Sequence, residues 1–183
     1  MVAPYCLPDA FSGSDCDRII ALARAAPLAD AGLVRNASDH NIRRSDLAWL
    51  DERDGAGWVM ERIIAIVARA NREVFDFALS EFAESAQVAR YGAEREGHFD
   101  WHSDIGAGAV AARRKLTMVV QLSDPAGYRG GVLELMPDAQ VRAAESARGT
   151  ATLFPSFVLH RVTPVTEGTR WSLTIWAHGP AFR

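Results

Sequence analysis

Residues 150–177 read TATLFPSFVLHRVTPVTEGTRWSLTIWA, and this stretch contains three short runs that are rich in β-branched and aromatic residues. The runs cover residues 150–154, 158–163 and 170–177, and Pro, Ser and Gly separate them. Such runs favour β-strands, whereas the residues between them favour turns. The stretch therefore predicts strands without intervening helices, which is typical of a sandwich or jelly roll rather than a parallel α/β sheet.

The same strand pattern starts at about residue 84 and continues to the end of the chain. Further runs of this kind cover residues 87–91, 115–122 and 132–136. Gly130-Gly131 precedes the last of them and marks a tight backbone turn. We expect residues 84–180 to form the β core.

The first 80 residues have a helical texture instead. Ser12 to Asp15 offers an N-cap for a helix that Pro27 stops. Apolar residues at three- and four-residue intervals predict a second helix over residues 58–77, and residues 28–54 predict loop or short strands. The prediction is one domain over residues 1–183, mainly β with flanking helices (α+β), in which residues 1–80 form a helix-rich support.

Composition restricts the class of protein and its partners. The chain has 183 residues, 49% of them hydrophobic, with 23% charged residues and a net charge of −3. This fits a globular domain and gives no electrostatic reason to expect nucleic acid or an anionic membrane as partner. No apolar stretch approaches the roughly 20 residues of a membrane helix, and no signal peptide is expected. Two cysteines without a CxxC spacing favour a reduced, cytoplasmic protein.

Two histidines and one aspartate form the candidate metal site. His102 and Asp104 are two residues apart, so both side chains project from the same face of an extended segment. His160 lies in a distant strand run, as a neighbouring strand must. Two imidazoles and one carboxylate form the facial triad typical of non-haem iron(II) oxygenases. Three ligands leave positions for a chelating 2-oxo acid and for dioxygen.

Arg170, ten residues after His160, is the candidate anchor for the far carboxylate of that acid. A guanidinium matches a carboxylate with two parallel hydrogen bonds. We expect the strand that carries Arg170 to pair near the strand that carries His160, with residues 163–168 as the turn.

Other residues leave two interpretations open. Arg43 and Arg44 either reach a substrate carboxylate or backbone, or are solvated loop charges. Tyr91 either contacts the co-substrate or packs in the core, and the same choice holds for Trp176. His98 is expected to be a surface residue or a neighbour of the ligands rather than a ligand. No metal role is expected for His40 and His178. Phe99 and Trp101 are expected to pack the barrel.

Over nearly its whole length the chain resembles the iron(II)- and 2-oxoglutarate-dependent oxygenases, most closely the prolyl 4-hydroxylase-like branch. The matching residues are Leu7-Pro8 before a capped helix, Arg44-Ser45 with Trp49-Leu50, Tyr91 with Gly97, Phe99, His102 and Asp104, Gly130-Gly131-Val132-Leu133, Leu153-Phe154-Pro155-Ser156, His160-Arg161-Val162, and Gly168-Thr169-Arg170 with Trp176.

The resemblance implies a double-stranded β-helix, a jelly-roll and cupin-like core. It also implies Fe(II), 2-oxoglutarate and O₂ as cofactor and co-substrates, with ascorbate as a candidate reductant. The implied reaction is hydroxylation of an aliphatic C–H bond, first of all in a prolyl residue of a protein or peptide, with release of succinate and CO₂. Tyr91, Thr117, Thr174 and Trp176 are the implied further contacts of the co-substrate.

Three other functions compete with prolyl hydroxylation. The first is hydroxylation of a free amino acid or other small metabolite; a closed, charged cavity would favour it, whereas an open groove lined by residues 36–50 would favour a peptide. The second is a non-catalytic jelly-roll protein that binds a metal or ligand. A nucleic-acid demethylase ranks low, because that branch carries a second arginine where this chain has Trp176.

Overall fold

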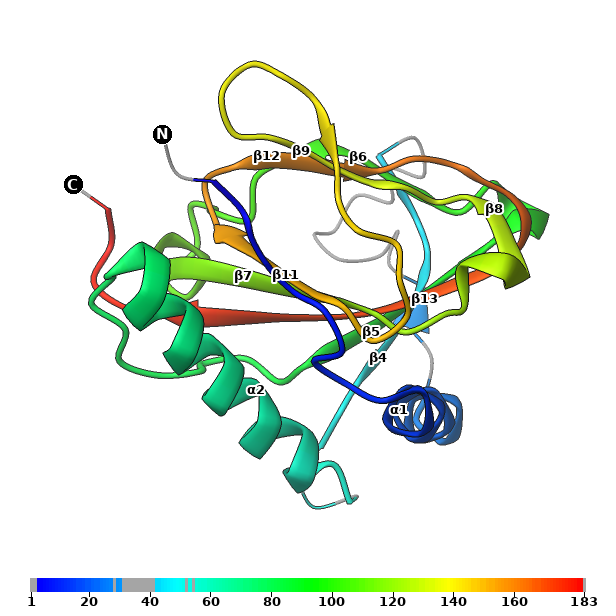
Figure 1. Cartoon of the computed structure of the whole chain (residues 1–183), viewed down its shortest axis with the longest axis horizontal. Coiled ribbons are helices and arrows are strands. Elements are labelled where there is room, and N and C mark those ends of the chain that lie inside the picture. Colours follow the sequence, from blue (N-terminus) through cyan, green and yellow to red (C-terminus); the bar gives the residue numbers. More distant parts are fainter. Residues whose placement is uncertain (1–2, 28, 31–41, 52, 54, 183) are drawn as a thin grey trace.

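Two β-sheets face each other, and two helices lie on the outer side of the larger sheet (Figure 1). A computed structural model describes residues 3–27, 29–30, 42–51, 53 and 55–182. The arrangement confirms the prediction of a mainly β protein with flanking helices.

The larger sheet has eight strands within the described residues, and the smaller sheet has five. The order in the larger sheet is β1 (Tyr5–Leu7), β11 (Ala151–Pro155), β7 (Arg114–Gln121), β13 (Val165–His178), β5 (Gln87–Gly92), β4 (Asp46–Trp49) and β2 (Ala29–Asp30), while β8 (Tyr128–Gly130) pairs with the beginning of β13. The order in the smaller sheet is β10 (Arg142–Ala143), β9 (Leu133–Met136), β12 (Leu159–Val162), β6 (His98–His102) and β3 (Arg43–Arg44). The strands at the ends of both orders are only two or three residues long.

Both helices begin near their predicted positions, but the second ends earlier. α1 (Gly13–Ala25) starts at Ser12, whose hydroxyl accepts a hydrogen bond from the Asp15 N–H at 3.1 Å. α2 (Gly57–Ala70) stops short of the predicted residue 77, because the chain widens into a π-helical turn (Asn71–Phe75) that the left-handed Asp76 (φ 49°) ends. Single 3₁₀ turns cover Ala93–Arg95, Ala111–Arg113 and Pro125–Gly127. In the described part of the chain, no helix combines the length and the apolar character needed to cross a membrane.

The side chains of the larger sheet point alternately to its two faces, and each face packs in a different hydrophobic core. On β7, Met118 and Val120 pack in the core that α1 and α2 share, whereas Val119 packs in the core between the two sheets. Successive side chains of a strand point to opposite faces, so one face is closed by helices and the other faces the smaller sheet. The polar residues of the second face therefore lie between the sheets.

The predicted pairing of the strands that carry His160 and Arg170 is wrong. β12 lies between β9 and β6 in the smaller sheet, whereas β13 lies between β7 and β5 in the larger sheet. The chain changes sheets at Thr163 and Pro164 instead of making a hairpin, and β13 already begins at Val165. His160 and Arg170 consequently line the same cavity from different sheets.

The first part of the chain supplies strands as well as helices. Residues 28–54, predicted as loop or short strands, contribute β3 to the smaller sheet and β4 to the larger one. β1 adds an edge to the larger sheet beside β11. The Phe11 N–H, which follows β1, donates to the Gly149 carbonyl at 3.1 Å.

Gly149→Ala is expected to destabilise the fold more than Gly55→Ala. Both glycines have positive φ, 82° at Gly149 and 89° at Gly55. A Cβ added to Gly149 would lie 1.9 Å from the Phe11 carbonyl oxygen, whereas a Cβ added to Gly55 would have no heavy atom within 4 Å. A left-handed alanine alone costs roughly 1–2 kcal/mol. In urea denaturation, Gly55→Ala should lose about that much of the free energy of unfolding and Gly149→Ala clearly more. Equal losses would mean that Phe11 moves away freely.

Candidate metal centre and its cavity

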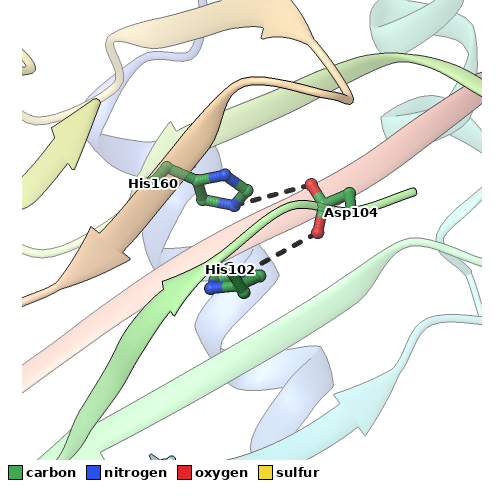
Figure 2. A group of neighbouring side chains, drawn as sticks. All are labelled: His102, Asp104 and His160. Atoms are coloured by element: carbon green, nitrogen blue, oxygen red, sulfur yellow. Dashed lines mark ion pairs between the residues drawn. The ribbon is translucent and has the colours of Figure 1, made fainter. Parts of the chain in front are cut away.

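The two predicted histidines meet the predicted aspartate at one point between the sheets. His102 and His160 are direct partners in the pairing of β6 with β12. The Nε2 atom of His102 lies 3.7 Å from Oδ1 of Asp104, and that of His160 lies 3.5 Å from Oδ2 (Figure 2). One donor atom from each residue lies within 4.8 Å of the others. The three side chains can therefore share one metal ion.

Backbone hydrogen bonds set both imidazoles to present Nε2. Nδ1 of His102 lies 2.7 Å from the Asp100 carbonyl oxygen, and Nδ1 of His160 lies 3.0 Å from that of Val158. A carbonyl oxygen only accepts, so each Nδ1 carries the proton and each Nε2 keeps its lone pair. Histidines that bind a metal through one ring nitrogen commonly donate the N–H of the other to a carbonyl or carboxylate in this way.

The third donor, Asp104, is buried and held by hydrogen bonds of its backbone and its side chain, including one from Arg114 Nη1 to its carbonyl oxygen at 3.0 Å. Its N–H donates to the Ser156 carbonyl at 2.9 Å, and its Oδ2 accepts from the Thr117 hydroxyl at 2.7 Å. Burial raises the pKa of Asp104, but His160, His102 and the Thr117 hydroxyl together hold it below its usual value. Burial lowers the pKa of His102 to about 4. At neutral pH, His102 is thus neutral and Asp104 ionised, which are the states that bind metal.

Aromatic rings fix the planes of the imidazoles. Phe99 stacks on His102 with ring centroids 3.5 Å apart, and Phe154 lies 4.8 Å from His160. Phe99 thus packs as predicted, and it does so against a candidate ligand.

A cavity of about 40 Å³ opens beside the three donors, between the sheets. Its lining contains most of the residues for which the sequence predicted a co-substrate or substrate role. These are Arg43, Tyr91, Arg170, Thr174 and Trp176, together with His102, Asp104 and His160. Thr117 is not among the lining residues; it is fully buried, and its hydroxyl donates to Asp104 and lies 3.0 Å from the Ser156 hydroxyl. Arg44 lies outside the cavity, 3.3 Å from the Glu96 carboxylate.

Arg170 is a buried cation whose described partners are neutral. Its side chain is 2% exposed, Nε donates to Gln121 Oε1 at 3.1 Å, and Nη1 donates to Ser172 Oγ at 3.4 Å. No carboxylate of the described residues lies within ion-pair distance of it. Burial lowers its pKa, as expected for a charge that lacks a counter-ion. An anionic ligand would supply that counter-ion.

Arg43 is a second guanidinium of this kind on the same cavity. It is half-buried, donates to Ser45 Oγ at 2.9 Å and to Gln87 Oε1 at 3.0 Å, and lies 4.4 Å above the Phe99 ring. Among residues placed by the structure, no acidic side chain forms an ion pair with it.

The buried indole N–H of Trp176 has no acceptor at hydrogen-bond distance in the described part of the chain, although it lies near enough to the Asp104 carboxylate to help lower the pKa of that group. A buried donor without an acceptor is costly, so a bound oxygen ligand in the cavity would satisfy it. This donor, the three metal-binding atoms and the Arg170 guanidinium together fit a metal with an anionic chelator.

The other two histidines of the described residues, His98 and His178, do not belong to the metal-binding group. Nδ1 of His98 lies 2.8 Å from the Glu96 carbonyl oxygen, and His178 is fully buried with Nε2 3.1 Å from Glu84. His40 lies outside the described residues.

Sequence reasoning missed Ser156, Gln121 and Ser172 at this site. Ser156 and Gln121 act through hydrogen bonds to Asp104 and Arg170, across long sequence separations. Strand periodicity carried a signal for two of them, since Gln121 lies four residues after Thr117 and Ser172 two residues after Arg170 on the same strand faces.

Comparison with known proteins relates the chain to one family. The model of the 2OG-Fe(II) oxygenase superfamily matches residues 86–178. A PKHD-type hydroxylase of Hyphomonas neptunium is 30% identical over 152 residues, which cover 80% of this chain and 65% of that protein. One of Synechococcus elongatus is 29% identical over 149 residues, which cover 70% of this chain and 66% of that protein. The chain thus spans two thirds or less of the length of these curated relatives.

Solved structures share the fold at low sequence identity. A prolyl hydroxylase of Trichoplax adhaerens, in complex with a peptide fragment of the hypoxia inducible factor oxygen degradation domain, aligns with a TM-score of 0.78 and 20% identity, over 96% of this chain and 83% of that one. A Pseudomonas putida prolyl-4-hydroxylase aligns with a TM-score of 0.75 and 20% identity, over 98% and 94% of the two chains. These likenesses confirm the predicted jelly-roll fold.

His102→Ala and His160→Ala are each expected to abolish tight metal binding, because two donors hold the ion poorly against water. The loss in affinity should exceed the roughly 100-fold that removal of an outer hydrogen-bond partner causes. Titration calorimetry with Mn(II) measures it, and His98→Ala is the matched control that should retain binding. Unchanged affinity in either ligand variant would remove that histidine from the metal site.

Proposed function

Because this chain belongs to the 2OG-Fe(II) oxygenase superfamily, we propose that it is an iron(II)- and 2-oxoglutarate-dependent dioxygenase that hydroxylates an aliphatic C–H bond. One observation carries the proposal furthest: the buried Arg170, without a described carboxylate partner, borders the same cavity as His102, Asp104 and His160. A ligand with a metal-chelating end and a carboxylate end matches both features. 2-Oxoglutarate has these two ends.

The residues of the chain have separate tasks in this proposal. His102, Asp104 and His160 hold iron(II) by one face, and Arg170 binds the far carboxylate of 2-oxoglutarate with its planar fork of donors. When bound, iron(II) supplies the activation of dioxygen, with 2-oxoglutarate consumed to succinate and CO₂. Tyr91, Thr174 and Trp176 line the space between these anchors.

The walls of the cavity contribute by excluding water. Val119, Leu133 and Val162 line it with apolar surface between the two sheets. In such surroundings, each charged hydrogen bond is stronger than it would be in water, and the reacting groups are kept in place. Positioning and exclusion are the main tasks of the protein around a cofactor that supplies the chemistry.

The first candidate substrate is a prolyl residue in a protein or peptide. Two observations support it: the fold matches prolyl hydroxylases over nearly the whole chain, and one of those structures contains a peptide. Arg43 would then bind a main-chain carbonyl of the peptide, since a guanidinium donates to any exposed carbonyl oxygen.

The second candidate substrate is a free amino acid or another small carboxylic acid. Arg43 favours it, because a half-buried guanidinium without a described acidic partner attracts a carboxylate more strongly than a neutral carbonyl. The described cavity is small and carries two guanidiniums. Residues 36–41 of the predicted groove lie outside the described part.

Arg170→Ala is expected to raise the KM for 2-oxoglutarate, with the anchoring hydrogen bonds worth about 2–5 kcal/mol, or roughly 30-fold and more. Succinate formation at varied 2-oxoglutarate, with saturating iron(II), measures the effect. Arg129→Ala removes an exposed guanidinium from a neighbouring strand and is the matched control, which should change KM little. An unchanged KM in Arg170→Ala would place the anchor elsewhere, and no succinate from the wild type with any substrate would favour the non-catalytic binder.

Arg43→Ala is expected to reduce hydroxylation of the substrate without changing the KM for 2-oxoglutarate. A panel of prolyl peptides, free amino acids and small carboxylic acids, read by mass spectrometry for the gain of one oxygen, first identifies an acceptor. Arg44→Ala is the control next in sequence and outside the cavity. If Arg43→Ala and Arg44→Ala behave alike toward that acceptor, Arg43 is not its anchor.

A further inference from the structure

We infer that Gln121 is a positioning residue that makes the site selective for a 2-oxo acid with a second carboxylate. It fixes the Arg170 guanidinium by a hydrogen bond and leaves its positive charge uncancelled. The inference rests on the proposed function, in which Arg170 binds the far carboxylate of 2-oxoglutarate.

The orientation of the Gln121 amide follows from its partners. Nε2 donates to the Ser123 carbonyl oxygen at 3.2 Å and to the Tyr128 hydroxyl at 2.8 Å. A carbonyl oxygen only accepts, so the nitrogen of the amide must face Ser123. Oε1 therefore faces Arg170 and accepts from its Nε at 3.1 Å. Only 5% of Gln121 is exposed, so these bonds are largely shielded from bulk water.

The aliphatic part of Arg170 is held from the opposite side by backbone. A Cβ on Gly131 would lie 3.0 Å from Arg170 Cδ and 2.9 Å from Val165 Cγ2. Gly131 has φ 61° and follows β8, so the chain closes directly over the stem of the arginine. This close approach explains why glycine stands there.

Arg170 lines two cavities. It borders the 40 Å³ cavity beside the metal-binding residues and also a cavity of about 190 Å³ that Gln121, Tyr128 and Glu145 line. The bond from Gln121 fixes Nε and thereby the plane of the fork. A fixed fork loses less entropy when a carboxylate binds.

A neutral amide at position 121 is what keeps Arg170 available. A glutamate has nearly the same shape, but its carboxylate would form a buried ion pair with Arg170 and cancel its charge. A second carboxylate, from 2-oxoglutarate, would then meet a compensated guanidinium and a nearby negative charge. Gln121 thus orients the cation without neutralising it.

The test compares two five-carbon 2-oxo acids, 2-oxoglutarate and 2-oxopentanoate, which differ in the charge at the far end. Titration calorimetry with Mn(II)-loaded protein measures both affinities, and steady-state succinate formation gives KM and kcat. Gln121→Glu should weaken 2-oxoglutarate binding by about tenfold or more, with 2-oxopentanoate little changed, so that the selectivity ratio falls. A general loss of structure would weaken both ligands.

Gln121→Met removes the hydrogen bond without adding charge, and it decides the question if Gln121→Glu does not fold. It should weaken 2-oxoglutarate binding by a smaller factor and leave 2-oxopentanoate unaffected; unchanged affinity for both acids would overturn the inference. The exposed Gln140→Glu adds the same charge far from the site and should leave both affinities unchanged.

Arg170→Ala separates this inference from the proposed function. If Arg170→Ala loses affinity for 2-oxoglutarate and Gln121→Glu keeps it, the role of Gln121 is wrong and the anchor stands. If Arg170→Ala keeps that affinity, the anchor itself is wrong.

Discussion

The pairing of β6 with β12 is the constraint on which the candidate centre depends. It sets His102 opposite His160, and the carbonyls of residues 100 and 158 then orient both rings. A shift of one residue in this register would turn one imidazole to the outer face of the smaller sheet. Val162 pairs with Phe99 in the same two strands, but a bulge between this pair and the His160–His102 pair shifts the register, so that His102 and Phe99 are three residues apart on β6 while their partners are two apart on β12. Both Val162 and Phe99 pack in the core between the sheets. Phe99 stacks on the ring of His102 and thereby joins this apolar core to the metal-binding atoms.

The two faces of the larger sheet differ: one is apolar and packs against the helices, and the other carries polar residues that line the cavity. One face packs against α1 and α2 and supplies most of the buried core. The other face presents Arg170, Ser172, Thr174 and Trp176 in sequence along β13, each two residues after the last. A single strand therefore carries a row of polar groups toward the candidate metal, while its alternate residues stabilise the fold. The cost of burying Arg170 is reduced, since Gln121 and Ser172 accept from two of its nitrogens and a ligand can supply the missing charge.

The sequence predicted what depends on local pattern and spacing. Runs of β-branched and aromatic residues identified six strands, β5, β7, β9, β11, β12 and β13, but not β6, which carries His102. The two-residue spacing of His102 and Asp104 predicted that both side chains face one ion. The pairing of β13 was mispredicted, because the Pro and Gly signals in residues 163–168 indicate a change of direction but not which sheet receives the next strand. The contribution of Gln121 was not predicted either. Its role depends on Tyr128 and on Arg170, which lies 49 residues away along the chain.

The short terminal strands of both sheets have a consequence for behaviour in concentrated solution. β1, β2, β3 and β10 have two or three residues each. An outermost strand exposes unpaired N–H and C=O groups, onto which a second polypeptide can add by hydrogen bonding. An edge strand of two or three residues offers few such groups, so we expect these edges to be poor sites for intermolecular sheet extension or amyloid-like growth. The long strands β7 and β13 would be far better templates, and their position in the middle of the sheet keeps them shielded.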